Sequence, residues 1–225
     1  MNELTPKQRV ALQVASEVQN GMCLGLGSGA TVNLVTAALG ERIKRGELHD
    51  LRVVVASRWT DAAARAAGLP LATLNDVPQL DLAIDGADEV SPQYNMIKGG
   101  GGALLRERIV LGAAARRVIA VDEGKLVQTL GERWFVPVEV VQFGWRVADV
   151  ALRELGSDPQ LRMDGTQPFV TDEGNYILDC AFGQIPQPLE LAQTLWAAPG
   201  VMDHGLFLGL ADRVLVGTTI DVYEL

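Results

Sequence analysis

Two aspartates and a lysine are the residues best placed for acid–base chemistry on a small ligand. Asp85 and Asp88 lie three residues apart in the segment DGADE, directly after residues 80–84, which are predicted to form a buried strand. Carboxylates at a strand end can hold ligand hydroxyls or transfer protons, and a pair of them can also hold Mg²⁺. Lys98 argues against a metal, because it would bring a positive charge to the same pocket. The simpler alternative is that Asp85 caps a turn or a helix.

Glu107 is a further candidate for acid–base chemistry, and it follows a run of four glycines at residues 99–102. Consecutive glycines cost backbone entropy on folding, so such a run is expected where a ligand presses against the main chain. Glu107 falls on the first turns of the next predicted helix, where the helix dipole favours the carboxylate form. Desolvation by a bound substrate would raise its basicity. The alternative is a solvated glutamate that pairs with Arg106 or Arg108.

A glycine loop at residues 25–31, GLGSGAT, lies between a predicted strand and a predicted helix. Its glycines let backbone N–H groups approach an anion, and the helix N-terminus adds a positive dipole end. Ser28 and Thr31 add hydroxyl groups. The loop also fits the loose dinucleotide pattern G-x-G-x-x-A, but the next strand ends at residues 56–58 without the acidic residue that would bind a ribose hydroxyl. A phosphate loop is therefore favoured over a dinucleotide site or a simple tight turn.

A second lysine, Lys125, ends the segment VDEGK, which follows a predicted strand at residues 117–121. From this place its side chain could reach a phosphate group or another ligand oxygen. The alternative is an exposed lysine without a specific role. The pattern alone does not decide between the two.

Alternating strands and helices are predicted to position these segments. Short apolar strands are expected at residues 22–26, 51–56, 69–73, 80–84 and 117–121, with helices between most of them. This alternation is typical of an α/β fold with a doubly wound, mostly parallel (Rossmann-like) sheet. Ligands of such sheets bind beyond the carboxyl ends of the strands, where the glycine loop, the aspartate pair and the glycine run are expected.

The pattern changes near residue 132, and the second half of the chain predicts a small inserted domain. Its elements follow in the order β-α-β-β-α-β, typical of a ferredoxin-like α+β domain, with a last strand at 201–208. An apolar strand at 213–216 is expected to return to the main sheet. We therefore predict a Rossmann-like catalytic domain of residues 1–131 plus 209–225 and a ferredoxin-like small domain of residues 132–208.

The composition limits the classes of partner and compartment. The 225 residues include 19 basic and 28 acidic side chains, a net charge of −9, and nucleic-acid binding needs clustered Lys and Arg instead. No apolar run reaches the roughly 18 residues that span a membrane. The polar N-terminus does not fit a secretory signal peptide, so a cytoplasmic protein is expected. Cys23 and Cys180 have neither zinc-ligand nor CxxC spacing.

Four of these segments together resemble the ribose-5-phosphate isomerase A family. GLGSGAT, DGADEV, KGGGGALLRERIV and VDEGK occur in the family's order and spacing between residues 25 and 125. The predicted insertion and returning strand are similar to the family's second half. One departure is visible: the family's loop commonly reads GTGST, whereas this chain has GSGAT. Ala30 therefore lacks a hydroxyl, which affects side-chain binding at that position but not the backbone contribution.

The resemblance implies an aldose–ketose isomerase that interconverts D-ribose 5-phosphate and D-ribulose 5-phosphate through an enediol, in the non-oxidative pentose phosphate pathway. No metal and no cofactor are implied. Glu107 would be the general base that carries the proton between C1 and C2. Ring opening and stabilisation of charge on the substrate oxygens would fall to Asp85, Asp88 and Lys98.

The same resemblance implies the residues that bind the sugar phosphate. They are Ser28, Gly29, Ala30, Thr31, Asp85, Gly86, Ala87, Asp88, Lys98, Gly99, Gly100, Gly101 and Lys125. Lys125, with Lys7 as a further candidate, would complete the anionic end of the site. The implied partners are a small sugar phosphate and further copies of the chain, in a homodimer or higher homo-oligomer, with neither nucleic acid nor membrane.

Three other functions compete with this one. A non-catalytic sugar-phosphate sensor of similar fold would need an attached DNA-binding domain, for which the chain has neither spare length nor a basic face. An NAD(P)-dependent oxidoreductase would bind nicotinamide, which a fluorescence titration can test. The third alternative is a protein similar to the coenzyme A transferases, which are related to this family by fold.

Overall fold

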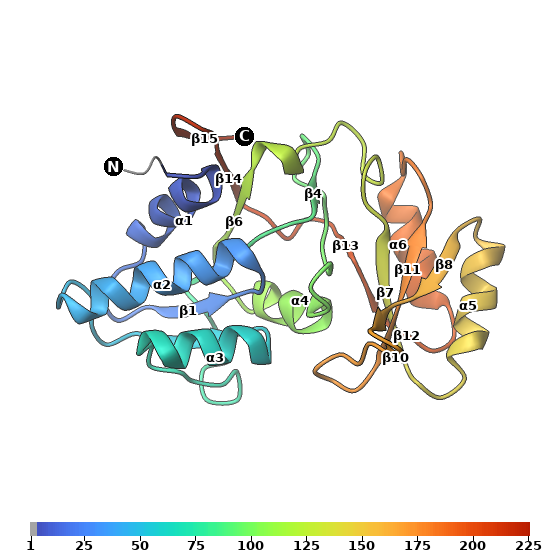
Figure 1. The fold of residues 1–225 in the computed structure, drawn as a ribbon, viewed down its shortest axis with the longest axis horizontal. Helices are drawn as coiled ribbons and strands as arrows, with labels where there is room; N and C mark the ends of the chain where they lie inside the picture. Colours follow the sequence, from blue (N-terminus) through green and yellow to red (C-terminus); the bar gives the residue numbers. More distant parts are fainter. Residues whose placement is uncertain (1–3) are drawn as a thin grey trace. The chain divides into compact units, whose positions relative to one another are not determined.

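The structure, a computed structural model, describes residues 4–225, which form two compact units. The first unit holds the chain up to Ala87, then Arg106–Lys125 and Gly209–Leu225; the second holds Asp88–Leu105 and Leu126–Leu208. The helices, labelled in Figure 1, are α1 (Pro6–Ser16), α2 (Ala30–Lys44), α3 (Arg58–Ala67), α4 (Leu104–Gly112), α5 (Trp145–Glu154) and α6 (Pro188–Ala197). The strands are β1 (Cys23–Leu26), β2 (Arg52–Val55), β3 (Leu82–Asp85), β4 (Glu89–Val90), β5 (Met96–Ile97), β6 (Arg117–Asp122), β7 (Val136–Val140), β8 (Asp158–Leu161), β9 (Met163–Asp164), β10 (Gln167–Pro168), β11 (Tyr176–Ala181), β12 (Val201–His204), β13 (Leu206–Phe207), β14 (Arg213–Gly217) and β15 (Val222–Glu224). None of the helices in residues 4–225 is long and apolar enough to cross a membrane.

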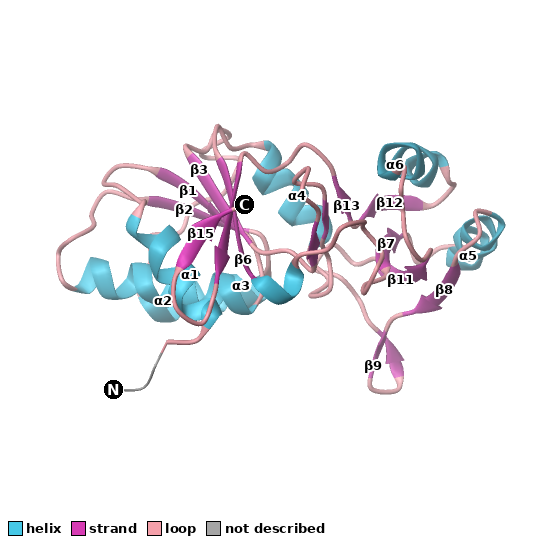
Figure 2. Cartoon of the chain, turned by 90° about the horizontal axis from the view of Figure 1, so that it is seen from above, coloured by secondary structure: helices cyan, strands magenta, loops and turns pink. Residues whose placement is uncertain are grey.

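A six-stranded sheet organises the first unit, in the order β15-β14-β6-β3-β1-β2. Neighbouring strands are parallel, except that β15 runs antiparallel to β14. Strands β1 and β3 are buried along their whole length, as expected for a sheet covered on both faces. Figure 2 shows α1, α2 and α3 together on one side of this sheet. The predicted Rossmann-like parallel sheet is therefore confirmed, and β14 is the strand that returns after the insertion.

Helix α4, which carries Glu107, packs on the other face of this sheet where Gly25 of β1 has no side chain. A Cβ at Gly25 would lie 2.6 Å from Cγ1 of Val110. The flanking Leu24 and Leu26 instead belong to the core beneath α1 and α2, because successive residues of a strand point to opposite faces. Gly25 thus allows the helix to lie close against the strand.

The second unit is built on an antiparallel sheet in the order β12-β7-β11-β8. Its elements follow the sequence order β7-α5-β8-β11-α6-β12, with the small hairpin β9–β10 inserted, so the predicted ferredoxin-like domain is confirmed. One face of the sheet packs against both helices. Val138 and Val140 alternate along β7, and Leu178 and Cys180 along β11, and they form one core with Leu152 of α5 and Leu195 of α6. The residues between them, such as Pro137 and Asp179, point to the opposite, helix-free face.

A three-stranded sheet, β13-β5-β4, completes the second unit. Because β4 and β5 pair with each other and with β13, residues 88–105 lie in this unit, whereas the predicted division places them with the parallel sheet. The predicted strand at 201–208 is in fact two strands in two sheets, β12 and β13. Gly205 separates them, and a Cβ there would lie 2.4 Å from the carbonyl oxygen of Lys98.

One predicted strand of the first unit is absent. Residues 69–73 contribute a single isolated bridge, in which Leu71 pairs with Val53. The segment is apolar enough to cover the end of the sheet but makes no continuous ladder. The prediction of a strand there was wrong, because apolarity over so few residues indicates burial rather than strand pairing.

Candidate active site

Asp85 ends β3 and is held against the glycine loop of the first unit. Its Oδ1 accepts hydrogen bonds from the backbone N–H groups of Gly86, at 2.8 Å, and Ser28, at 3.3 Å. The residue is buried, with 1 % of its surface exposed. Gly27 makes this position possible, since a Cβ there would lie 1.9 Å from Cγ of Asp85. The carboxylate is therefore fixed at the carboxyl end of the parallel sheet.

The glycine loop turns at Gly29, which has a φ of 110° and stands at the N-cap of α2. Helix α2 begins at Ala30, so the N–H groups of its first turn have no partners within the helix. N–H groups at a helix start attract anions. Thr31 lies on this first turn, and Ala30 is exposed beside it. The loop has the geometry expected of an anion-binding turn.

A chain of hydroxyl groups supports the loop from α3. The oxygens of Ser28 and Ser57 lie 2.9 Å apart, Ser57 donates to Thr60 at 3.0 Å, and Thr60 donates to the carbonyl oxygen of Gly27 at 2.9 Å. Ser57 also caps α3 by accepting from the N–H of Thr60. Neither Ser57 nor Thr60 is among the predicted site residues. The S-x-x-T pattern at a helix start was the available signal, but it does not show that the cap reaches another loop.

Glu107 and Lys125 are the remaining candidates in the first unit. Glu107 lies in the first turns of α4, as predicted, and only 4 % of its surface is exposed. Lys125 is half-buried in a short 3-10 turn after β6. Nearby, Lys7 forms an ion pair of 3.8 Å with Asp122.

In the second unit, Asp88 and Lys98 lie at the same end of the β4–β5 hairpin, Asp88 directly before β4 and Lys98 directly after β5. The last pair of the ladder is Glu89 with Ile97. The N–H of Asp88 donates to Ile97 at 2.8 Å. Lys98 is buried, with its Nζ 5.5 Å from the ring centre of Phe207. The hairpin thus holds close together the backbones of two candidate residues that lie ten positions apart in the sequence.

Glu89, in the same DGADE segment, has a structural role. It is buried, and its two carboxylate oxygens accept hydrogen bonds from the backbone N–H groups of Gly131, Arg133 and Trp134 at 2.6–2.8 Å. Three such bonds stabilise a buried carboxylate. Glu89 therefore anchors the hairpin that presents Asp88 and Lys98.

The run of four glycines is explained largely by contacts within the second unit. Gly99 and Gly102 have φ values of 102° and 79°, which favour glycine. A Cβ at Gly102 would lie 2.5 Å from the ring of Phe169, and one at Gly100 would lie 2.9 Å from both carboxylate oxygens of Asp88. Gly101 differs, because a Cβ there would have no atom within 4 Å. Of the four, Gly101 is the position with open space for a ligand.

The predicted site residues divide between the two units. The first unit holds Ser28, Gly29, Ala30, Thr31, Asp85, Gly86, Ala87, Glu107 and Lys125, and the second holds Asp88, Lys98, Gly99, Gly100 and Gly101. The chain passes between the units at the Ala87–Asp88 peptide and again after Leu105. Candidate residues therefore flank these two of the four points at which the chain passes from one unit to the other. Within residues 4–225, no group of three or more His, Cys, Asp or Glu side chains could hold a metal ion.

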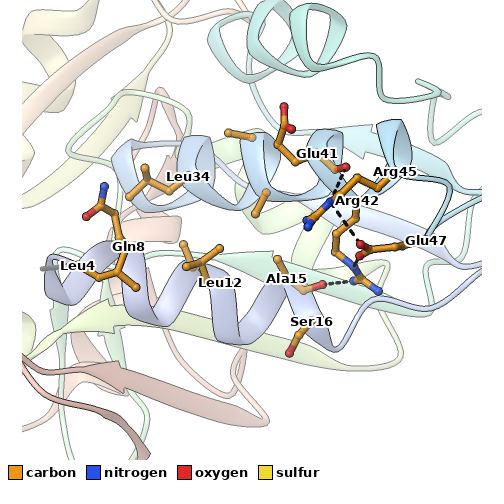
Figure 3. A pocket seen from close by; sticks show the side chains of 13 residues that line it. Leu4, Gln8, Leu12, Ala15, Ser16, Leu34, Glu41, Arg42, Arg45 and Glu47 are labelled. Atoms are coloured by element: carbon orange, nitrogen blue, oxygen red, sulfur yellow. Dashed lines mark hydrogen bonds and ion pairs between the residues drawn. The ribbon is translucent and has the colours of Figure 1, made fainter. Parts of the chain in front are cut away.

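A separate pocket of about 530 Å³ lies between α1 and α2 (Figure 3). Leu12 and Leu34 face one another across it, and Arg42 ion-pairs with Glu47 at 3.7 Å at one end. None of the predicted site residues lines this pocket. This pocket is thus distinct from the groups that could perform acid–base chemistry.

Comparison with known proteins gives a consistent result. Residues 52–220 match the family described as "Ribose 5-phosphate isomerase A (phosphoriboisomerase A)". The ribose-5-phosphate isomerase A of Thermosynechococcus vestitus is 48 % identical over 219 residues, 96 % of this chain and 92 % of that protein. The solved ribose 5-phosphate isomerase A of Methanocaldococcus jannaschii is 38 % identical, with a TM-score of 0.92 over 98 % of this chain and 97 % of that one. A solved D-ribose-5-phosphate isomerase in complex with phospho-erythronic acid is 37 % identical, with a TM-score of 0.95 over 100 % and 99 % of the two chains.

Proposed function

The chain belongs to the ribose 5-phosphate isomerase A family, and we propose that it interconverts D-ribose 5-phosphate and D-ribulose 5-phosphate by acid–base chemistry at Glu107, Asp85, Asp88 and Lys98. The match of residues 52–220 to the family is the observation on which the proposal chiefly rests, and the buried carboxylate of Asp85, held by the N–H groups of Gly86 and Ser28, supports it. Within the same fold, no observation favours the non-catalytic sensor. The enzyme is thus an aldose–ketose isomerase.

Ring opening is the first step of the proposed mechanism. One group takes the proton of the anomeric hydroxyl while another delivers a proton to the ring oxygen. Asp85 and Asp88 are suited to this exchange because each is held by backbone N–H groups, from Gly86 and Gly100 respectively. Each carboxylate therefore keeps its position while its proton comes and goes.

Isomerisation of the open chain follows. Glu107 takes the proton from C2 to give the enediol and returns it to C1, which requires one base within reach of two adjacent carbons. Its burial excludes water, which would otherwise compete for the proton. Lys98 stabilises the negative charge that develops on the substrate oxygens. The reaction needs no external oxidant or reductant, because the oxidation of C2 is balanced by the reduction of C1.

The 5-phosphate is assigned to the glycine loop and Lys125. The first turn of α2 supplies N–H donors behind Gly29, and Lys125 adds a positive charge. Lys7 is a weaker candidate, since Asp122 already neutralises part of its charge. Unphosphorylated ribose should therefore be a very poor substrate, because phosphate binding energy would be missing from the transition state.

A coupled assay of ribose 5-phosphate conversion in the presence of EDTA tests this function. Activity that is lost with EDTA and restored by Mg²⁺ or Mn²⁺ would overturn the assignment of Lys98 as the stabilising charge. Phospho-erythronic acid, which a related isomerase binds, offers a second probe. Its carboxylate resembles an enediolate, so it should compete with ribose 5-phosphate.

We also propose a homodimer or higher homo-oligomer that works in the cytoplasm, in the non-oxidative pentose phosphate pathway. The second unit offers a candidate surface on α5, where Val147 and Val150 are more than half exposed, and Phe143, just before the helix, is 95 % exposed. The two valines lie three residues apart on one side of the helix, and exposed apolar patches mark contact sites. Changing both valines to glutamate should yield monomers in sedimentation. An unmodified chain that sediments as a fully active monomer at micromolar concentration would refute the assembly.

A further inference from the structure

Arg162 connects the four-stranded sheet of the second unit to the run of four glycines at residues 99–102. It follows β8 directly, and its Nη1 donates to the carbonyl oxygens of Gly99, at 2.9 Å, and Gly100, at 3.1 Å. The other edge of the guanidinium donates to both carboxylate oxygens of Asp179 on β11. The side chain is 12 % exposed. Arginine is therefore held in one geometry with its donors aimed at the glycine backbone.

Aromatic rings fix the plane of this guanidinium. Its centre lies 5.9 Å from the ring centres of both Phe135 and Phe169. Phe169 is also the residue that a side chain at Gly102 would strike. Cation–π contacts of this kind favour arginine over lysine, and only the planar fork serves a carboxylate and two carbonyls at once.

The peptide group between Gly99 and Gly100 links Arg162 to a candidate catalytic carboxylate. In a trans peptide the C=O and N–H point in opposite directions. The Gly99 carbonyl accepts from Arg162, while the Gly100 N–H donates to Oδ2 of Asp88 at 2.8 Å. A cation at the oxygen end and an anion at the hydrogen end both align with the peptide dipole, so each bond strengthens the other.

We infer that Arg162 is a positioning residue for the isomerase reaction, which fixes the Gly99–Gly100 peptide and, through it, the carboxylate of Asp88. The inference rests on the role proposed for Asp88. Asp179 acts one step further away, by orienting the guanidinium. The four-stranded sheet thereby holds a candidate catalytic residue in place, in addition to any role in assembly.

Kinetics of Arg162 variants provide the first test. Arg162→Met should lower kcat by about 10- to 100-fold, the cost of misplacing a catalytic group by around 1 Å, and should change KM much less. The kcat of Arg162→Lys should lie between those of the unmodified enzyme and Arg162→Met, and Asp179→Asn should have a kcat similar to that of Arg162→Lys. The matched control is Arg153→Met, because Arg153 on α5 also binds two carboxylates, Asp149 and Asp158, away from the glycine run. Equal effects of Arg162→Met and Arg153→Met would overturn the inference.

A double-mutant cycle separates positioning from general stability. If Arg162 acts through Asp88, adding Arg162→Met to Asp88→Asn should cost much less than it does in the unmodified enzyme. Full additivity of the two changes would refute the link. Millimolar guanidinium added to Arg162→Ala should restore part of kcat, whereas Arg153→Ala should not respond.

An observation independent of activity distinguishes this inference from the proposed function. In protein labelled with ¹⁵N-glycine, the Gly100 amide should exchange with solvent faster in Arg162→Met than in Arg153→Met, while Gly40 in α2 serves as an internal reference. An unchanged Gly100 amide would overturn the inference about Arg162. A chain that lacks isomerase activity before any substitution would instead overturn the proposed function.

Discussion

Gly27→Ala gives the sharpest test of how the first unit holds Asp85. The added Cβ would lie 1.9 Å from Cγ and 2.0 Å from Oδ1 of Asp85, whereas ordinary contacts begin near 3.4 Å. The two groups must therefore separate by 3.4 − 1.9 = 1.5 Å. The loop is bonded to α3 through Thr60 and to β3 through the Gly27 N–H, which donates to Ile84 at 2.9 Å. The carboxylate is thus the group that must move.

Two consequences follow from that displacement. Overpacking of this size costs about 1–3 kcal/mol of stability, and each kcal/mol lowers Tm by about 2–4 °C in a protein of this length. Misplacing a catalytic group by about 1 Å reduces the rate by about 10²-fold, so kcat/KM should fall by at least that factor if Asp85 is catalytic.

Scanning calorimetry and a coupled isomerase assay measure these two effects in the same preparation. The matched control is Gly112→Ala at the end of α4, where an added Cβ would meet nothing within 4 Å and alanine should slightly favour the helix. A Gly27→Ala enzyme with the Tm and kcat/KM of the Gly112→Ala control would refute the assigned packing. A lowered Tm with unchanged kcat/KM would support the assigned packing but would refute a catalytic role for Asp85.

Three other predictions concern single side chains. Glu107→Gln should lower kcat by about 10²-fold or more with little change in KM, and substrate in D₂O should no longer exchange its transferred hydrogen; exchange at the original rate would place the base elsewhere. Burial raises the pKa of Glu139 above its ordinary value of 4.5, against the hydrogen bonds from Asn175 and Thr171. The folded state then binds this proton more tightly than the unfolded state, so stability falls as pH rises from about 4.5 through the raised pKa. Glu139→Gln should flatten that part of a curve of Tm against pH and should raise Tm at neutral pH. An unchanged curve would contradict this prediction. Burial raises the pKa of the Cys180 thiol to about 12, so iodoacetamide at pH 8 should label it only after unfolding, as peptide mass spectrometry can check.

The sequence predicts the segments of the candidate site more readily than it predicts how they are supported. DGADE and the glycine run could be identified because rare residue types are concentrated there. Strands β4 and β5 have two residues each, which is too short for any periodicity, and their partner β13 lies more than a hundred residues further on. Their pairing brings Asp88 and Lys98 to the same end of one hairpin, yet no local pattern indicates it.

The structural reason for a glycine was also difficult to predict from the sequence. The sequence suggested that a ligand explains the four-glycine run, but Gly99, Gly100 and Gly102 are explained by positive φ or by contacts with Asp88 and Phe169. Gly27 was read as a loop glycine, although the side chain that excludes a Cβ there is Asp85, 58 residues away. A glycine required by a distant contact cannot be told from one required by a turn until the fold is known.

Asp88 and Lys98 also show that the two units cannot be separated into a catalytic part and an assembly part. Their hairpin is anchored by Glu89 on the N–H groups of Gly131, Arg133 and Trp134, and by the pairing of β5 with β13. All of these partners belong to the second unit. The second unit therefore carries the support for two of the four candidate catalytic residues, Asp88 and Lys98, whatever its role in assembly.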